Sequence, residues 1–311
     1  MTISDWCADY LQIADLSPLT RRKYESDYVN YLGALGALPL GSVAALDVQR
    51  WAAQLPPRLS DKSRRNIIGA VLSALHYAYD MRIVDNYITL RAPRRRHTQD
   101  DYTRGMDISD YRAVVSAGYA SDDIYAPVVI LGACAGLRLG EILGLQWRDV
   151  CDDNLYIHRQ LLYVPRSGYS YATPKHGKAR RVYVSPRLLS YLAAQRRWRR
   201  VSGADTDTVV CNDTGGHAVH YTARRHAQSI MRAATGGAYT VHDLRHAYAT
   251  HMLRAGADAR TVAAQLGHHS PGFTLRQYVY ATPDAQRTAA ARLDSYTNTH
   301  NPHTTHTQST L

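Results

Sequence analysis

The sequence predicts a mostly helical protein in two parts, the second of which also contains a small antiparallel sheet. Apolar residues recur at helical spacing through most of the chain. A stretch rich in arginine and proline interrupts this pattern near residue 93, and segments with strand character appear between residues 155 and 184. With 311 residues, 45% of them hydrophobic, the chain is long enough for two domains with real cores.

Residues 1–92 are expected to form a small, all-helical domain. One helix begins at Ser17, an N-cap that is followed by Pro18 at the first helical position. Further helices are expected at 48–55 and 60–84. The residues expected to face the core recur three or four positions apart: Tyr24, Tyr28, Tyr31, Leu35, Val48, Trp51, Leu55, Ile67, Ile68, Val71, Leu72, Leu75 and Tyr79.

Residues 93–104 have the composition of a basic interdomain linker, in which Pro93 disfavours helix in the residue before it. Two other basic clusters open predicted helices at 21–23 and 62–65. Each of these clusters is either a solvated helix face or a surface that contacts a phosphate backbone, and the linker is either merely flexible or lies near the same backbone. The candidates for such contacts are Arg21, Arg22, Lys23, Lys62, Arg64, Arg65, Arg94, Arg95 and Arg96.

The composition limits the class of partner. A net charge of +11 and a pI near 9.5 favour a polyanion, most often nucleic acid. No apolar run approaches the roughly 18–20 residues of a membrane span, and the first residues lack the features of a signal peptide, so a cytoplasmic protein without membrane contact is expected. The scattered cysteines are expected to be free thiols: Cys7, Cys134, Cys151 and Cys211.

Residues 105–298 are expected to form the larger domain, and the polar tail at 299–311 to be disordered. Strand character at 155–164 and 169–184 is interrupted by turn signals at 167–168 and 176–177. The helices expected in this domain span 108–117, 186–200, 221–234 and 284–296, and residues 125–135 form a long apolar segment.

Arg138 lies between Leu137 and Leu139 in a segment otherwise built for a core. A charge in such a place is costly unless it is paired, so Arg138 is expected to have a fixed anionic partner. Either Glu141, three residues later, pairs with it, or Arg138 reaches a phosphate while Glu141 orients it.

The stretch from His242 to Tyr278 combines residues suited to phosphate chemistry. His242 and Arg245 are three apart, so they share a helix face and can address one anion together. The guanidinium matches phosphate oxygens, and the imidazole moves protons near neutral pH. A tyrosine beside such groups can attack a phosphodiester and hold the product covalently, which hints at strand joining rather than hydrolysis.

With these motifs the chain resembles the tyrosine site-specific recombinases, the phage integrase and Xer-type group, from about residue 5 to 296. The segments A-G-L-R-L-G-E-I-L-G-L, T-P-K-H-G-K-A-R-R-V, H-D-L-R-H, L-G-H-H-S and T-L-R-Q-Y are similar to the family's motifs and fall in the family's order. The resemblance implies a helical core-binding (SAM-like) domain and a mainly helical catalytic domain that close around DNA. It assigns the catalytic roles to Arg138, Lys175, His242, Arg245, His268 and Tyr278, with Glu141 in support.

The family's chemistry implies no metal and no other cofactor. The partners it implies are double-stranded attachment or core sites, a tetramer formed on DNA through the C-terminal helix, and accessory DNA-bending or directionality factors. Tyr280 is the rival nucleophile, but the spacing from Leu266-Gly267-His268 favours Tyr278.

Other functions remain in competition at this point. An integrase and an Xer-like dimer resolvase share all these motifs. A type IB topoisomerase or a telomere resolvase uses the same side chains, and a catalytically silent DNA-binding protein would have no use for Tyr278. A metalloenzyme is disfavoured because no known ligand spacing appears among His217, His220, His242, His246, His268 and His269.

Overall fold

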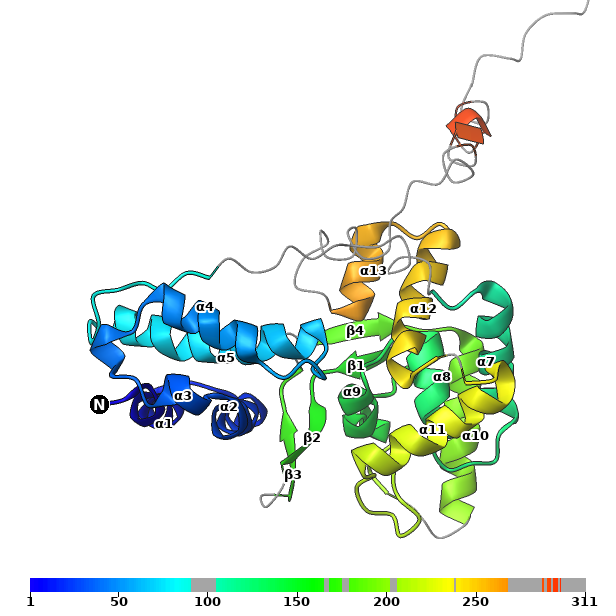
Figure 1. Ribbon diagram of the computed structural model, residues 1–311. Helices are drawn as coiled ribbons and strands as arrows, with labels where there is room; N and C mark the ends of the chain where they lie inside the picture. The colour runs from blue at the N-terminus through cyan, green and yellow to red at the C-terminus, as the bar shows by residue number, and fades with distance from the viewer. Residues whose placement is uncertain are drawn as a thin grey trace, which may run out of the picture. The chain divides into compact units, whose positions relative to one another are not determined.

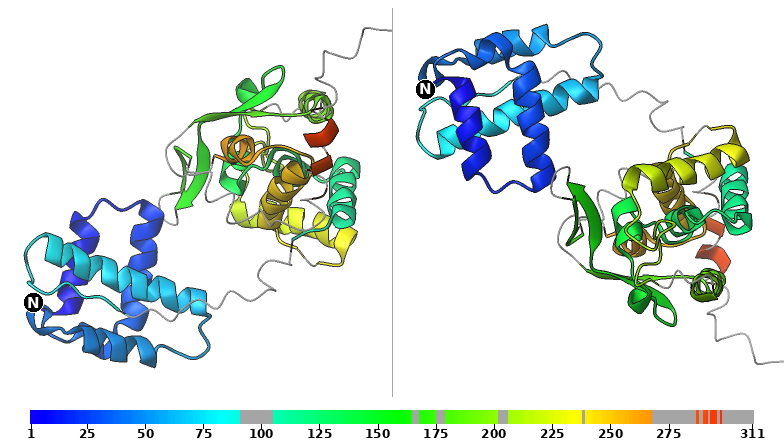
Figure 2. Two further views of the ribbon diagram at one scale, coloured as in Figure 1. Left: turned by 90° about the horizontal axis from the view of Figure 1, so that it is seen from above. Right: turned by 90° about the horizontal axis from the view of Figure 1, so that it is seen from below.

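The computed structural model describes residues 1–90, 105–164, 168–174, 179–201, 206–237 and 239–267, and near the C-terminus residues 287, 290, 291, 293–295 and 297. The chain divides into two compact units, Met1–Thr98 and Gln99–Leu311 (Figures 1 and 2). The linker expected at 93–104, with Arg94, Arg95 and Arg96, and the tail at 299–311 lie outside the described residues. The domain limits given above therefore stay predictions.

The regular secondary structure that is described in the first unit consists of helices. Its α-helices and one 3₁₀ helix are α1 (Ile3–Ile13), α2 (Pro18–Tyr31), α3 (Gly33–Gly36), η1 (Leu40–Ser42), α4 (Ala45–Gln54) and α5 (Asp61–Asp80). Ser17 caps α2 as expected, and Ser60 caps α5; each serine hydroxyl accepts a backbone N–H. Helix α1 was not predicted. Thr2 and Asp5 form a capping box at its start, with the Asp5 carboxylate 2.8 Å from the Thr2 backbone nitrogen.

Helices α1, α2 and α5 pack on one another around the core of this unit. The indole of Trp6 donates to the Ala74 carbonyl (2.7 Å), and the Tyr28 hydroxyl donates to the Ala70 carbonyl (2.8 Å), so α1 and α2 are both fixed to the middle of α5. One expectation is wrong: Tyr79 is 40% exposed and contacts the ring of Tyr87 instead of the core.

The second unit is organised around a helix that is apolar all round. Its elements are α7 (Ile108–Ala120), α8 (Ala126–Ala135), α9 (Leu139–Gly144), η2 (Trp147–Asp149), β1 (Asn154–Ile157), β2 (Gln160–Val164), β3 (Gly168–Ala172), β4 (Arg180–Tyr183), α10 (Pro186–Val201), α11 (His220–Thr235), α12 (Val241–Arg254) and α13 (Ala259–Leu266). Helix α8 packs against α7, α11 and α12 (Figure 1). An apolar helix is buried on every side, and nearly all of α8 is inaccessible to solvent.

The strands form two small antiparallel pairs instead of one sheet. β1 pairs with β4, and β2 pairs with β3. In the first pair Leu155 lies opposite Val182, and both are fully buried, so this pair closes one side of the core. Of the last helix expected at 284–296, the residues that the structure describes are helical, and Leu293 among them is exposed.

Three helices among the described residues of this unit end in a left-handed glycine, and two of these glycines differ in their surroundings. Gly136 caps α8 with φ +64°, and Gly236 caps α11 with φ +71°. A Cβ atom on Gly136 would lie 2.5 Å from the Tyr248 ring and 2.7 Å from the Leu266 side chain, whereas a Cβ on Gly236 meets nothing within 4 Å.

This contrast predicts the cost of two matched substitutions. Gly236→Ala should destabilise the unit only through its left-handed backbone, by about 1–2 kcal/mol. Gly136→Ala should cost about 1–3 kcal/mol more, because the neighbours of the new methyl group must move. Calorimetry of both variants measures the difference, and equal shifts in the melting temperature would contradict this explanation.

Candidate active site

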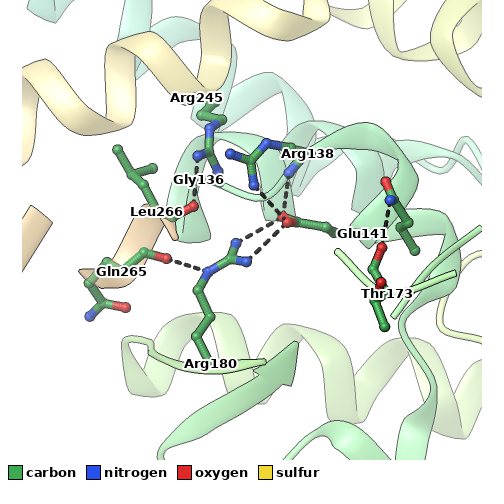
Figure 3. Close-up of polar contacts among 9 residues, drawn as sticks. Gly136, Arg138, Glu141, Thr173, Arg180, Arg245, Gln265 and Leu266 are labelled. Carbon is green, nitrogen blue, oxygen red and sulfur yellow. Dashed lines mark hydrogen bonds and ion pairs between the residues drawn. The ribbon is translucent and has the colours of Figure 1, made fainter. Parts of the chain in front are cut away.

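Arg138 lies where the chain leaves the core between α8 and α9. Gly136 turns the chain, Leu137 is buried, and Arg138 becomes the N-cap residue of α9 with 22% of its side chain exposed. Its Nη1 donates to Glu141 Oε1 at 2.9 Å, and its backbone N–H donates to Glu141 Oε2 at 2.9 Å (Figure 3). The expected pairing of Arg138 with Glu141 is therefore present in the structure.

The partner of this arginine is a buried carboxylate that also binds a second guanidinium. Glu141 is 1% exposed, and both of its oxygens accept from Arg180, at 3.0 Å from Nη1 and 2.8 Å from Nη2 (Figure 3). Burial by itself raises the pKa of a carboxyl group, but the hydrogen bonds and charges of Arg180 and Arg138 outweigh it and hold the pKa of Glu141 at about 2. Glu141 is therefore ionised at neutral pH.

Arg245 comes to the same place from α12, which is far away in the sequence. The side chain is on the buried face of that helix, and the residue is 3% exposed. Its Nη1 donates to the Gly136 carbonyl and its Nη2 to the Leu266 carbonyl, both at 2.7 Å (Figure 3). The guanidinium is thus held between the end of α8, two residues before Arg138, and the end of α13.

The end of α13 is a meeting point for two arginines. The last carbonyls of a helix lack intrahelical partners, and cations are favoured beside them. Here the Gln265 carbonyl accepts from Arg180 Nε at 2.8 Å, and the Leu266 carbonyl accepts from Arg245. Gly267 follows in a left-handed conformation (φ +65°), where a Cβ would approach the Arg180 guanidinium to about 3.0 Å.

His242 is exposed in the first turn of α12, one turn before His246. The two rings lie edge to face with centroids 4.7 Å apart. Burial lowers the pKa of His246, and the neighbouring His242 lowers it further, so the neutral form of His246 is favoured at pH 7. The proton-transfer role of His242 stays a prediction.

Lys175, His268 and Tyr278 lie outside the described residues. The flanks of two of them are described. Lys175 belongs to the connection between β3 and β4, the strand that begins with Arg180, and His268 directly follows Gly267. The described residues next to Lys175 and His268 are therefore part of, or lie beside, the group formed by Arg138, Arg180 and Arg245. The roles of Lys175, His268 and Tyr278 stay predictions.

Sequence reasoning gave no role to Arg180. In the strand, Arg180 is directed to Glu141, whereas Arg181 beside it is exposed and donates to the Asn154 side chain (3.3 Å). Alternation along a strand could have shown that the two arginines face opposite ways. The partner on the inner face could not have been found from spacing, because Glu141 lies 39 positions earlier.

The basic residues predicted to contact DNA in the first unit differ in their surroundings. Arg21 donates to the Ala14 carbonyl (3.2 Å), Arg64 donates to the Pro56 carbonyl (3.1 Å), and Lys23 pairs with Asp27 (2.5 Å). Arg22, Lys62 and Arg65 are exposed. Arg21 and Arg64 thus bind backbone carbonyls of different interhelical segments. Their contact with DNA stays a prediction.

No cluster of three or more His, Cys, Asp or Glu side chains suited to a metal ion occurs in the described part of the chain. All four cysteines are unpaired. No helix among the described residues is long and apolar enough to cross a membrane.

Comparisons with known proteins agree with this arrangement. Residues 95–284 match the sequence profile of the phage integrase family. Tyrosine recombinase XerC of Oceanobacillus iheyensis is 24% identical over 305 residues, which cover 92% of this chain and 93% of that protein. The Tn1549 transposon integrase, solved in complex with transposon right end DNA, superposes with a TM-score of 0.77 at 18% identity and covers 94% of this chain and all of its own. A lambda integrase tetramer bound to a Holliday junction superposes with a TM-score of 0.61 at 18% identity, over 90% of this chain and 78% of that one.

The Glu141 cluster predicts how stability depends on acid. Because the pKa of Glu141 is lowered in the fold from 4.5 to about 2, its ion pairs stabilise the protein fully above pH 4.5 and lose that effect as the pH falls toward 2. Glu141→Gln should be less stable than the natural protein at pH 6, with a difference that shrinks between pH 4.5 and 2. Melting temperatures measured across this range test the prediction, and a difference that stays constant with pH would contradict it.

Proposed function

Since this chain belongs to the phage integrase family, we propose that it is a site-specific DNA recombinase that cuts and rejoins strands through a 3′-phosphotyrosine intermediate. The observation that carries the proposal is the convergence of Arg138 and Arg245. Arg138 follows the end of α8, and Arg245 binds carbonyls at the ends of α8 and α13. His268 comes two residues after the end of α13 in the chain. Two positioned guanidiniums at one place are suited to a phosphate, whose non-bridging oxygens gain charge in the transition state.

In this proposal each predicted residue has one task. Arg138 and Arg245 stabilise the non-bridging oxygens, and His268 adds a hydrogen bond. Tyr278 attacks phosphorus and leaves a 3′-phosphotyrosine and a free 5′-hydroxyl. A phenol has an ordinary pKa near 10, so His242 serves as the base, and Lys175 protonates the departing 5′-oxygen.

The energy of the broken bond is kept in the phosphotyrosine. The 5′-hydroxyl of a second strand can therefore reverse the step without ATP, and two such rounds exchange strands through a Holliday junction. The arginines supply the charge that a metal supplies in other phosphoryl transfers. The partners are double-stranded core or attachment sites, further copies of the chain in a tetramer joined by the C-terminal helix, and accessory DNA-bending or directionality factors. The protein would act in the cytoplasm, where such DNA is found.

The biological outcome has two candidates. Integration and excision of a mobile element is the first, and it agrees with the likeness to the Tn1549 transposon integrase. Resolution of chromosome or plasmid dimers is the second, and it is favoured by the similarity to a protein named XerC along nearly the whole chain. Incubation of the protein with genomic DNA of its source, arrest with SDS and sequencing of the protein-linked DNA separates them. Ends of a mobile element indicate the first function, and a single resident site the second.

Tyr278→Phe should abolish covalent attachment to DNA while leaving DNA affinity unchanged, because only the nucleophilic oxygen is removed. Tyr280→Phe is the matched control and should form the covalent complex at nearly the natural rate. Denaturing gels of a nicked duplex carrying the captured sequence measure both. Loss of attachment in the Tyr280 variant alone would move the nucleophile to that residue.

Lys175→Ala should slow cleavage by about 10²–10⁴-fold with little change in DNA binding, as expected for loss of a general acid. A substrate with sulfur in place of the 5′-bridging oxygen has a leaving group that needs no proton. On that substrate the variant should cleave nearly as fast as the natural protein. A variant that stays equally slow on the sulfur substrate would remove Lys175 from the acid role.

A further inference from the structure

We propose that Arg180 is a positioning residue of the recombination site, which saturates the Glu141 carboxylate so that Arg138 keeps a net positive charge for the scissile phosphate. The inference rests on the proposed function and deepens it, because it concerns how one of the proposed catalytic arginines is held and charged.

The hydrogen bonds of the cluster divide unequally between the two arginines. Arg180 uses all three of its guanidinium nitrogens, two on the Glu141 carboxylate and Nε on the Gln265 carbonyl (Figure 3). Among the described residues Arg138 uses only Nη1 of its guanidinium. The side chain of Arg180 is 9% exposed and that of Arg138 is 22% exposed. Arg180 is thus fully occupied inside the protein, whereas Arg138 retains donors on the more accessible side.

The charges lead to the same conclusion. Two guanidiniums share one carboxylate, so Arg138, Arg180 and Glu141 together carry one net positive charge. Without Arg180, Glu141 and Arg138 would form a neutral pair, and the carboxylate would repel an approaching phosphate from close range. In a water-poor site such repulsion is weakly screened. Glu141 can therefore orient Arg138 without cancelling its charge only while Arg180 is present.

Arg180 also joins the segments on which other proposed catalytic residues depend. Arg180 begins β4, after the connection that contains Lys175. Its Nε donates to the Gln265 carbonyl at the end of α13, three residues before His268. The Gln265 side chain completes this junction by accepting from the Tyr183 backbone N–H (3.1 Å). A shift of Arg180 would therefore be transmitted to three parts of the site at once.

The test compares variants on a nicked duplex carrying the sequence captured by the natural protein. Arg180→Met keeps the length of the side chain and should cut the rate of covalent-complex formation by about 10–100-fold, as for a misplacement of about 1 Å, with DNA affinity within about twofold. Arg181→Met is the matched control and should cleave at the natural rate. Arg181 is the next residue of the strand but is exposed, and within the described part of the chain its side chain contacts Asn154 and Tyr156 of β1.

The decisive variants restore the charge of the cluster. In Arg180→Met/Glu141→Gln the carboxylate charge is removed together with Arg180, so Arg138 again carries one net positive charge. This double variant should cleave several-fold faster than Arg180→Met alone. Arg180→Lys keeps the charge but not the two-pronged contact, and it should also exceed Arg180→Met. If Arg180→Met does not fold, the cleavage rate is expected to fall from the natural protein to Arg180→Lys and then to the double variant.

A merely structural role would also be relieved in the double variant, because no buried carboxylate is then left short of a partner. The rates are therefore compared below the melting temperature of every variant, where a merely structural role leaves them equal. The proposal is overturned if Arg180→Met cleaves like the natural protein, or if neither the double variant nor Arg180→Lys exceeds it. Where Arg180→Met does not fold, an Arg180→Lys rate no higher than that of the double variant overturns it. A natural protein that attaches to no DNA in the capture experiment would refute the proposed function instead.

Discussion

The structure of the site depends on one buried carboxylate shared by two guanidiniums. Glu141 is almost inaccessible to solvent, and removing its charge from water costs several kcal/mol unless it is fully paired. Arg138 and Arg180 supply that pairing from two segments that are 42 positions apart, through contacts to both carboxylate oxygens. This arrangement determines where the turn after α8 lies relative to β4.

The same region shows how helix ends can build a functional site. The Gly136 carbonyl, two residues before Arg138, and the last carbonyls of α13 would be buried without partners, and arginine side chains satisfy them. Glycines at 136 and 267 let the chain turn where a Cβ would touch Tyr248, Leu266 or Arg180. The close approach of these ends is what brings Arg138, Arg180 and Arg245 together.

The basic residues of the first unit serve more than one purpose. In the first unit, Arg21 and Arg64 bind backbone carbonyls of different interhelical segments, and Lys23 pairs with Asp27. Part of the excess positive charge thus serves the fold itself, and the exposed Arg22, Lys62 and Arg65 are the stronger candidates for contact with a phosphate backbone.

Local patterns were sufficient for much of the fold. The cap at Ser17 and the helical spacing of the apolar residues in α2, α4 and α5 depend on neighbouring residues, and so they could be predicted. Helix α1 was not predicted, although its capping box is local. The exposure of Tyr79 could not be predicted, since it depends on where α5 leaves the core.

By itself, the sequence determined the helical class, the family and the residue types available for phosphate chemistry, because these follow from composition, spacing and motif. It also determined that Arg138 needs an anion, since Glu141 lies one turn away in the same segment. Only the tertiary structure decided that Arg180 shares this anion and that Arg245 binds the ends of α8 and α13. Those contacts join residues far apart in the chain, and no periodicity encodes which distant charges meet when the core closes.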